Sequence, residues 1–195
     1  MDLVLASTSR YRRELLARLG IPFRCLAPQV DEEAFKTHGA APRQVAERLA
    51  QEKALRVAAR EPGATVIGGD QIVALGTAEA GSILGKPGSR EAAARQLAAL
   101  TGKSHELVTA IAIAHEGRLL THIDVAVLEM RSLDEAAIDR YLDADEPYDC
   151  AGAYKLEARG ITLFSRIASA DHSAITGLPL IALTTMLREL GFSIP

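Results

Sequence analysis

The sequence predicts an α/β fold with a mixed, twisted sheet that is flanked by helices around a central cleft. Two observations carry this prediction. Apolar strands that lead into capped helices are typical of βα units, which place strands in parallel. Two long alternating segments joined at Glu116-Gly117 instead predict an antiparallel hairpin. Together they indicate a sheet with both kinds of neighbour.

The N-terminal segment predicts a strand, a turn and a helix. Residues 2–6 read as a buried strand, and the hydroxyl residues 7–9 can cap a helix that runs to Leu19, with Gly20 as its end.

The next unit is a helix followed by a strand. Pro42 suits a first helical turn, and apolar residues recur at helical spacing to about Arg60. Residues 65–75 then predict a strand that carries Asp70 in its middle, where an unpaired carboxylate would be costly.

The remaining elements follow the same signals. Serine and proline residues indicate where helices start, and alternation of apolar and polar residues indicates strands. The expected helices cover residues 89–100, 132–142 (starting from a capping box at 132–135) and 179–190, and the expected strands cover residues 105–115, 118–130 and 161–167.

Composition favours one folded unit. The chain has 195 residues, of which 48% are hydrophobic, and its formal net charge is −3. This length predicts a single domain over residues 1–195, with two lobes around a substrate cleft. The charge argues against general nucleic-acid binding. The chain shows neither a signal peptide nor an apolar run of about 18 residues, so we expect a cytoplasmic protein that does not bind membranes.

The two cysteines do not point to a metal site or a disulfide. Cys25 and Cys150 are far apart and match no metal-ligand spacing. We expect both to be small core residues.

Residues 5–13, LASTSRYRR, could form a phosphate site. A strand would deliver three hydroxyls to a helix start, with arginines at 10, 12 and 13. Free N–H groups, the helix dipole and guanidinium groups suit a phosphate chain. Arg12 shares a helical face with leucines, so its guanidinium should point inward. The alternative is a capped helix with solvated arginines. The P-loop pattern GxxxxGK[ST] is absent from the sequence.

Three acidic residues could hold a divalent cation with phosphates. Asp70 lies in the C-terminal part of an apolar strand, where open α/β sheets bind ligands. Asp31 and Glu32 follow in a loop-like segment. For Glu32 the alternative is a solvated carboxylate beside Asp31 and Glu33.

Two lysines are further candidates for phosphate binding. Lys53 lies on the apolar stripe of its predicted helix, where an ammonium needs an anionic partner. Lys86 lies in the turn GKPG and is also well placed to reach a phosphate. The chain has 17 arginines but only five lysines, and codon bias explains this ratio as well as function does. His105 follows a helix-to-strand turn that could border a site.

These segments together resemble the Maf-like nucleoside triphosphate pyrophosphatases over nearly the whole chain. The matching segments, in the family's order, are LASTSRYRRELL, VDE, LAQEKA, VIGGDQIV, GKP, TGKSH, CAGAYKLEARGITLF and GLPLIALTTMLRELG. The resemblance implies an α/β fold of the inosine-triphosphate-pyrophosphatase type. It also implies Mg²⁺- or Mn²⁺-dependent cleavage of a nucleoside triphosphate to the monophosphate and diphosphate, and a homodimer.

The resemblance assigns roles to individual residues. Asp70 matches the family's general base or metal carboxylate, and Glu32 matches the metal shell. The residues that match its phosphate-binding positions are Ser7, Arg12, Arg13, Lys53 and Lys86. Those at its base-contacting positions are Tyr11, Gln71 and Glu157.

The base-contacting residues favour the branch of the family that hydrolyses 7-methyl-GTP. The dTTP/UTP branch typically reads DT and AGAYxIQG, whereas this chain reads DQ and AGAYKLE. Glu157 could accept hydrogen bonds from the N1–H and amine of guanine, a donor pair that thymine and uracil lack. Tyr11 stands where this branch usually has Trp, and the TGKSH segment with His105 looks more like the dTTP/UTP branch. The alternatives are therefore a dTTP/UTP pyrophosphatase, or a nucleotide-binding regulator of septum formation without turnover.

Overall fold

The structure is a computed structural model that describes residues 1–35 and 39–194. Its strands are β1 (Leu3–Ala6), β2 (Arg24–Cys25), β3 (Thr65–Leu75), β4 (Ser82–Leu84), β5 (Ser104–His115), β6 (Arg118–Met130) and β7 (Phe164–Ala168). Its α-helices are α1 (Arg10–Ala17), α2 (Pro42–Ala58), α3 (Arg90–Leu100), α4 (Glu135–Asp145), α5 (His172–Ile175) and α6 (Leu180–Glu189). Short 3-10 turns are η1 (Glu33–Phe35), η2 (Ala151–Ala153) and η3 (Arg159–Leu163).

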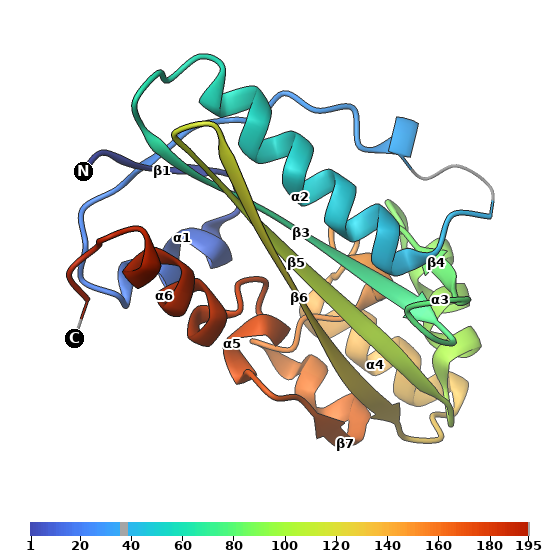
Figure 1. Ribbon diagram of the computed structural model, residues 1–195. Coiled ribbons are helices and arrows are strands. Elements are labelled where there is room, and N and C mark those ends of the chain that lie inside the picture. Colours follow the sequence, from blue (N-terminus) through green and yellow to red (C-terminus); the bar gives the residue numbers. More distant parts are fainter. Residues whose placement is uncertain (36–38, 195) are drawn as a thin grey trace.

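The described strands form one mixed sheet. Their order is β2-β1-β3-β5-β6-β7, and β4 pairs separately with β3. β1 runs parallel to β2 and β3, whereas the other pairs are antiparallel. The long β5–β6 hairpin crosses the molecule diagonally (Figure 1). The predicted mixed sheet with flanking helices is therefore confirmed.

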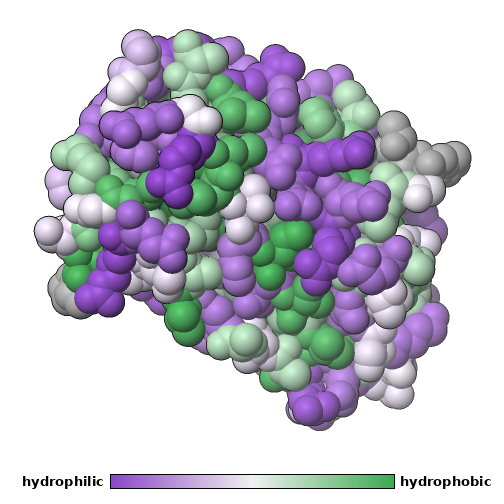
Figure 2. Space-filling view, viewed as in Figure 1, coloured by the Kyte–Doolittle hydropathy of each residue, from purple (hydrophilic) through white to green (hydrophobic). Residues whose placement is uncertain are grey.

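Helices cover both faces of the sheet. On one face α2 packs against β3 and β5 through small and branched side chains, including Val45, Leu49 and Val57. On the other face, α1 and α6 form one apolar cluster, and α3 and α4 form a second. Figure 1 shows α2 on one side of the hairpin and α1, α4 and α6 on the other. In the same orientation, hydrophilic residues make up most of the visible surface (Figure 2).

A glycine lets α2 lie directly on the central strand. A Cβ atom at Gly68 of β3 would lie 2.2 Å from the carbonyl oxygen of Ala50 and 2.6 Å from the amide nitrogen of Ala54. Any side chain at this position would push α2 off the sheet, because these contacts are with backbone atoms. The close approach places Lys53, which lies in the turn of α2 between these two alanines, against β3.

The edge of β3 is interrupted where its two neighbours end. β1 pairs with residues 65–68 and β4 with residues 73–75, so residues 69–72 have no described strand beside them on that edge. Because side chains alternate along a strand, Asp70 points to the α2 face and Gln71 to the opposite face. This notch exposes both sides of the central strand to one space.

Most predicted elements are present, with differences at their ends. Ser9 and Ser89 cap α1 and α3 as expected. The capping box at 132–135 is wrong in detail, because α4 starts after Asp134, whose carboxylate accepts from the Ala137 amide. Residues 161–163 form a 3-10 turn, so the last strand starts at Phe164.

The cysteine prediction is wrong for Cys25. Its side chain is exposed on the edge strand β2, and Cys150 is only half-buried. Both thiols are free. No helix in the described part of the chain has the length and apolar character needed to cross a membrane. The single-domain organisation remains a prediction.

Candidate functional site

A cavity of about 570 Å³ opens at the notch in β3. Its walls are built by the segment that joins β1 to α1, by β3 and α2, and by residues 149–157 and 175–177. The predicted site residues that line it are Ser7, Tyr11, Arg12, Glu32, Lys53, Asp70, Gln71, Lys86 and Glu157. Residues far apart in the sequence thus meet in one space. Arg13 is exposed and does not line the cavity.

Lys53 links the two acids that were predicted as metal ligands. Its Nζ lies 2.7 Å from Oδ1 of Asp70 and 2.6 Å from Oε1 of Glu32. The side chains of Lys53 and Asp70 are 5% and 7% exposed, whereas that of Glu32 is 45% exposed. Burial raises the pKa of Asp70, while Lys53 and Arg12 oppose the shift. The expected anionic partner of Lys53 is therefore present.

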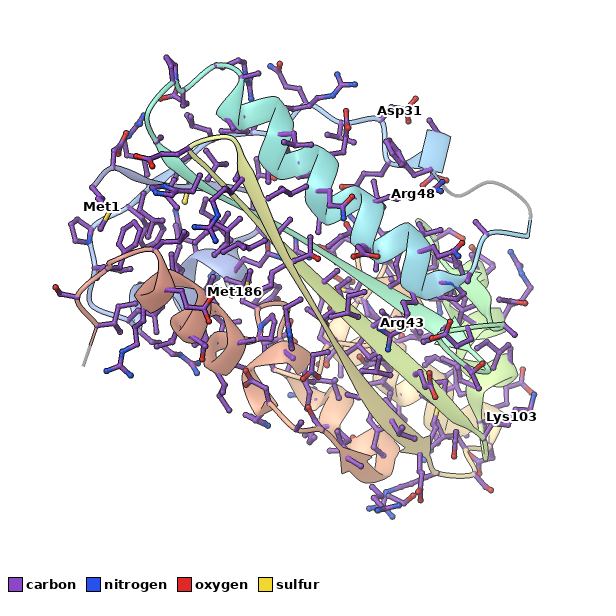
Figure 3. The ribbon with its side chains drawn as sticks, in the orientation of Figure 1. Met1, Asp31, Arg43, Arg48, Lys103 and Met186 are labelled. Carbon is purple, nitrogen blue, oxygen red and sulfur yellow. The ribbon has the colours of Figure 1, made fainter. Side chains whose placement is uncertain are left out.

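Removing Lys53 should cost both activity and stability. In Lys53→Met the Asp70 carboxylate would stay buried without its cation, so its pKa would rise further. A carboxyl group with a raised folded-state pKa loses stability as pH rises, so the deficit should reach roughly 3 kcal/mol near pH 7 and shrink toward pH 4. Urea unfolding at several pH values measures this. The control is Lys103→Met, on the surface near the start of β5 (Figure 3), which should match wild type at every pH. A pH-independent deficit would contradict the pairing.

The two acids suit a hard divalent cation that also binds phosphates. Mg²⁺ is commonly held by one or two carboxylates while substrate phosphates complete its shell. Asp70 and Glu32 provide such a pair on the cavity wall, joined through Lys53. Within the described residues no cluster of three or more His, Cys, Asp or Glu could form a complete protein site. Asp31 is exposed outside the cavity, and its side chain lies at the periphery (Figure 3).

Arg12 is held between two glycines at the cavity wall. Its Nε donates to the carbonyl oxygen of Gly177 at 3.0 Å. Cβ atoms at Gly69 and Gly177 would lie 3.5 and 3.4 Å from that Nε, at van der Waals contact, so both glycines pack closely against the Arg12 side chain. Burial lowers the pKa of Arg12, and Asp70 and Glu32 oppose this effect. Its terminal nitrogens have no described protein acceptor, which leaves them for a phosphate.

The other arginines of α1 follow the alternative of solvated charges. Arg10 is exposed and pairs with Glu14 at 2.7 Å, and Arg13 is exposed as well. The hydroxyl of Ser7 accepts from the Ser9 amide at 3.1 Å, which fixes the loop that enters the helix. Of the three arginines, only Arg12 therefore faces inward, as its helical register predicts.

The opposite end of the cavity has an acidic and aromatic lining. A hydrogen bond to the Glu157 carboxylate, together with burial, raises the pKa of the Tyr11 hydroxyl to about 12. Asp149 lines the same end. Burial raises the pKa of the Cys150 thiol to about 12, so this side chain stays neutral. Both predicted base-contacting residues of this wall, Tyr11 and Glu157, thus lie close enough to interact.

Several lining residues were missed by the sequence analysis. Val73 and Leu107 come from β3 and β5, and Asp149 precedes the segment CAGAYKLE. The others lie within that segment or at the end of α5, and they are Cys150, Ala151, Tyr154, Leu156, Ile175, Thr176 and Gly177. The CAGAYKLE segment is itself the available signal for Cys150, Ala151, Tyr154 and Leu156. The residues beside α5 have no such signal, because they contribute mainly backbone atoms.

His105 lies behind the cavity wall and does not line it. Its Nε2 is 3.0 Å from the hydroxyl of Tyr154, and its ring packs against Tyr154 and Phe164. The residue is only 1% exposed, and burial lowers the pKa of His105 to about 4. His105 is therefore a neutral support for Tyr154.

This burial predicts acid-sensitive stability. An unfolded histidine titrates near 6.5, so between pH 6.5 and 4 the unfolded chain takes up a proton that the folded chain does not. The free energy of unfolding should fall by up to roughly 3 kcal/mol over this window. His105→Gln should remove this part of the slope in urea unfolding, whereas the exposed-site variant His172→Gln should keep it. Equal slopes in all three proteins would refute the account.

The cavity combines cations and the carboxylates of Asp70 and Glu32 at one end with an aromatic and acidic lining at the other. In an α/β protein, such a combination has the charges and the aromatic face that suit a nucleotide. The family described as Maf-like protein matches residues 2–190, and the chain belongs to this family. The family predicted from the sequence is therefore confirmed.

Relatives with high identity carry one name. The 7-methyl-GTP pyrophosphatase of Xanthomonas oryzae pv. oryzae is 48% identical over 99% of this chain and 98% of its own length. The 7-methyl-GTP pyrophosphatase of Bordetella pertussis is 48% identical over 97% of this chain and 92% of its own length. That of Bdellovibrio bacteriovorus is 44% identical over 96% of both chains. Among solved structures, a HAM1 protein from Coxiella burnetii matches with a TM-score of 0.48 and 18% identity, over 97% of this chain and 99% of that one.

Proposed function

We propose that the protein hydrolyses 7-methyl-GTP to 7-methyl-GMP and diphosphate, with Mg²⁺ or Mn²⁺ as cofactor. The observation that carries the reaction type is the buried Asp70 carboxylate, held 2.7 Å from Lys53 inside a cavity that also contains Arg12. Pure nucleotide binding does not require a carboxylate among phosphates, because like charges repel there. The relatives named above support the choice of substrate.

The phosphate end can bind and polarise a triphosphate. Arg12 offers free guanidinium N–H groups, and Lys86 lines the same cavity from the end of β4. These cations neutralise charge that develops on the phosphates during cleavage. Asp70 orients the attacking water or takes its proton, because it is a buried carboxylate with a raised pKa. A bound divalent cation would add further charge neutralisation at Asp70 and Glu32.

The base end fits a methylated guanine. Methylation at N7 gives the ring a positive charge, which favours an aromatic face and nearby carboxylates. Tyr11 provides the face, and Glu157 and Asp149 provide the carboxylates. The Glu157 carboxylate only accepts hydrogen bonds, which matches the N1–H and amine of guanine.

The second candidate is hydrolysis of dTTP or UTP. The observation that favours it is Tyr11, because tyrosine is a weaker cation–π platform than tryptophan and reduces the advantage of a cationic base. The residue at 157 separates the two candidates, since a pyrimidine carbonyl gains nothing from a carboxylate.

The assembly and location are part of the same proposal. We place the enzyme in the cytoplasm as a homodimer, on the basis of its family resemblance. Light scattering after size-exclusion chromatography tests the dimer, and a monomer mass would remove that part of the proposal.

Identification of the products tests the reaction type. Purified protein with 7-methyl-GTP and Mg²⁺ should release the nucleoside monophosphate and diphosphate in equal amounts, separated by ion-exchange chromatography. Removal of the metal with a chelator should stop product formation, and added Mg²⁺ or Mn²⁺ should restore it. Release of inorganic phosphate and a nucleoside diphosphate would contradict the proposal.

A further inference from the structure

The side-chain amide of Gln71 is fixed by three acceptors. Its Nε2 lies 2.9 Å from the Thr109 hydroxyl, 3.0 Å from the carbonyl oxygen of Ala174 and 3.1 Å from that of Ile175. Gln71 and Thr109 are direct neighbours across β3 and β5. The two carbonyls come from the C-terminal half of α5. Three elements therefore meet at one amide group.

This arrangement allows only one orientation of the amide. Carbonyl oxygens accept and never donate, so the NH₂ group must face α5. The Thr109 hydroxyl donates its own hydrogen to the carbonyl of Ala174 at 2.9 Å, so it can only accept from Gln71. The reversed amide would place its oxygen against the two carbonyl oxygens, which repel it, and the Thr109 hydroxyl could donate to it only by giving up its bond to Ala174.

The carbonyl oxygen of Gln71 is consequently left for a ligand. Gln71 lines the cavity, and no described residue donates a hydrogen bond to its Oε1. This oxygen is also not among the fully buried polar atoms that lack a partner in the described chain. It is therefore an accessible acceptor in the wall of the same cavity as the Glu157 carboxylate.

We propose that Thr109 is a positioning residue for base selection, because it locks Gln71 so that only the Oε1 acceptor faces the nucleobase. With Glu157, the wall then offers two acceptors and no amide donor, which matches a base edge with two adjacent donors such as guanine. A pyrimidine edge, which alternates acceptors with its N3–H, finds no donor from Gln71. The inference rests on the proposed function, since it explains how that site prefers a guanine base.

A double-mutant cycle tests this inference through the ratio of kcat/KM for 7-methyl-GTP to that for UTP. Thr109→Val keeps the shape but removes one of the three acceptors that hold the two N–H groups of Gln71, so the amide is held less firmly and can turn. The ratio should fall about tenfold, mostly through KM for 7-methyl-GTP. Thr109→Ser keeps the hydroxyl and should restore the ratio. A ratio is insensitive to the amount of folded protein, so a general structural defect does not move it.

The second arm shows whether Thr109 acts through Gln71. In a Gln71→Met background the amide is gone, so adding Thr109→Val should leave the ratio unchanged. An equal effect in both backgrounds, an unchanged ratio in Thr109→Val, or a serine variant that behaves like valine would overturn the inference. If wild type prefers UTP, the proposed function fails. The same double-mutant cycle, measured as kcat/KM for UTP, then still tests the role of Thr109. An effect of Thr109→Val that is lost in the Gln71→Met background supports the inference, and an effect that persists there overturns it.

Discussion

Asp70→Asn should lower kcat/KM for the nucleotide substrate by roughly 10³-fold or more, with little change in melting temperature. The substitution keeps side-chain size but removes the buried charge that faces the phosphates. Lys53 retains Glu32 at 2.6 Å, so its ammonium does not become unpaired. Steady-state kinetics and thermal unfolding followed by circular dichroism measure the two effects.

The matched control for this variant is Asp31→Asn. Asp31 carries the same charge one residue before Glu32 but is exposed and does not line the cavity. It should retain wild-type kinetics. Near-wild-type turnover in Asp70→Asn would remove the central catalytic assignment, and a collapse of its melting temperature would show that Asp70 acts mainly in folding.

Glu157→Gln should change the preference for the base more than the rate on any preferred substrate. The amide replaces an acceptor-only group with one that also donates, so guanine loses a charge-assisted partner and a pyrimidine carbonyl gains a donor. A charged hydrogen bond contributes roughly 1.5–3 kcal/mol, which corresponds to a loss of about 10- to 150-fold in relative kcat/KM. Competition between 7-methyl-GTP and UTP in one reaction measures this ratio.

Two observations would separate this effect from a general one. Glu189→Gln removes the same charge from an exposed position at the end of α6, and it should leave the ratio unchanged. The Tyr11 hydroxyl can donate to either side chain at 157, so the wall itself should persist. If the ratio does not move in Glu157→Gln, Glu157 does not contact the base.

The sequence predicts the long elements and the phosphate end well because both depend on strong local patterns. Helical spacing placed Lys53 on the buried stripe of α2, and an acid inside an apolar strand marked Asp70. The structure joins the two at 2.7 Å. Consecutive arginines on a helix point about 100° apart, which explains why Arg12 faces the cavity while Arg13 is exposed.

The features that the sequence did not predict lack such patterns. β2 and β4 have two and three residues, too few for a period to be recognised. The notch in β3 depends on where those partners stop. The acceptors that hold Arg12 and Gln71 are backbone carbonyls of Ala174, Ile175 and Gly177, which are independent of residue type. Cys25 is exposed because its strand is at the edge of the sheet.

The most direct test of the account is the ranking of kcat/KM for wild-type protein across 7-methyl-GTP, GTP, UTP and dTTP at one Mg²⁺ concentration. The acceptor-only wall formed by Glu157 and Gln71, with the aromatic face of Tyr11, predicts that 7-methyl-GTP ranks first and that GTP, which lacks the ring charge, ranks below it. A ranking led by UTP or dTTP would contradict the account and leave the pyrimidine alternative.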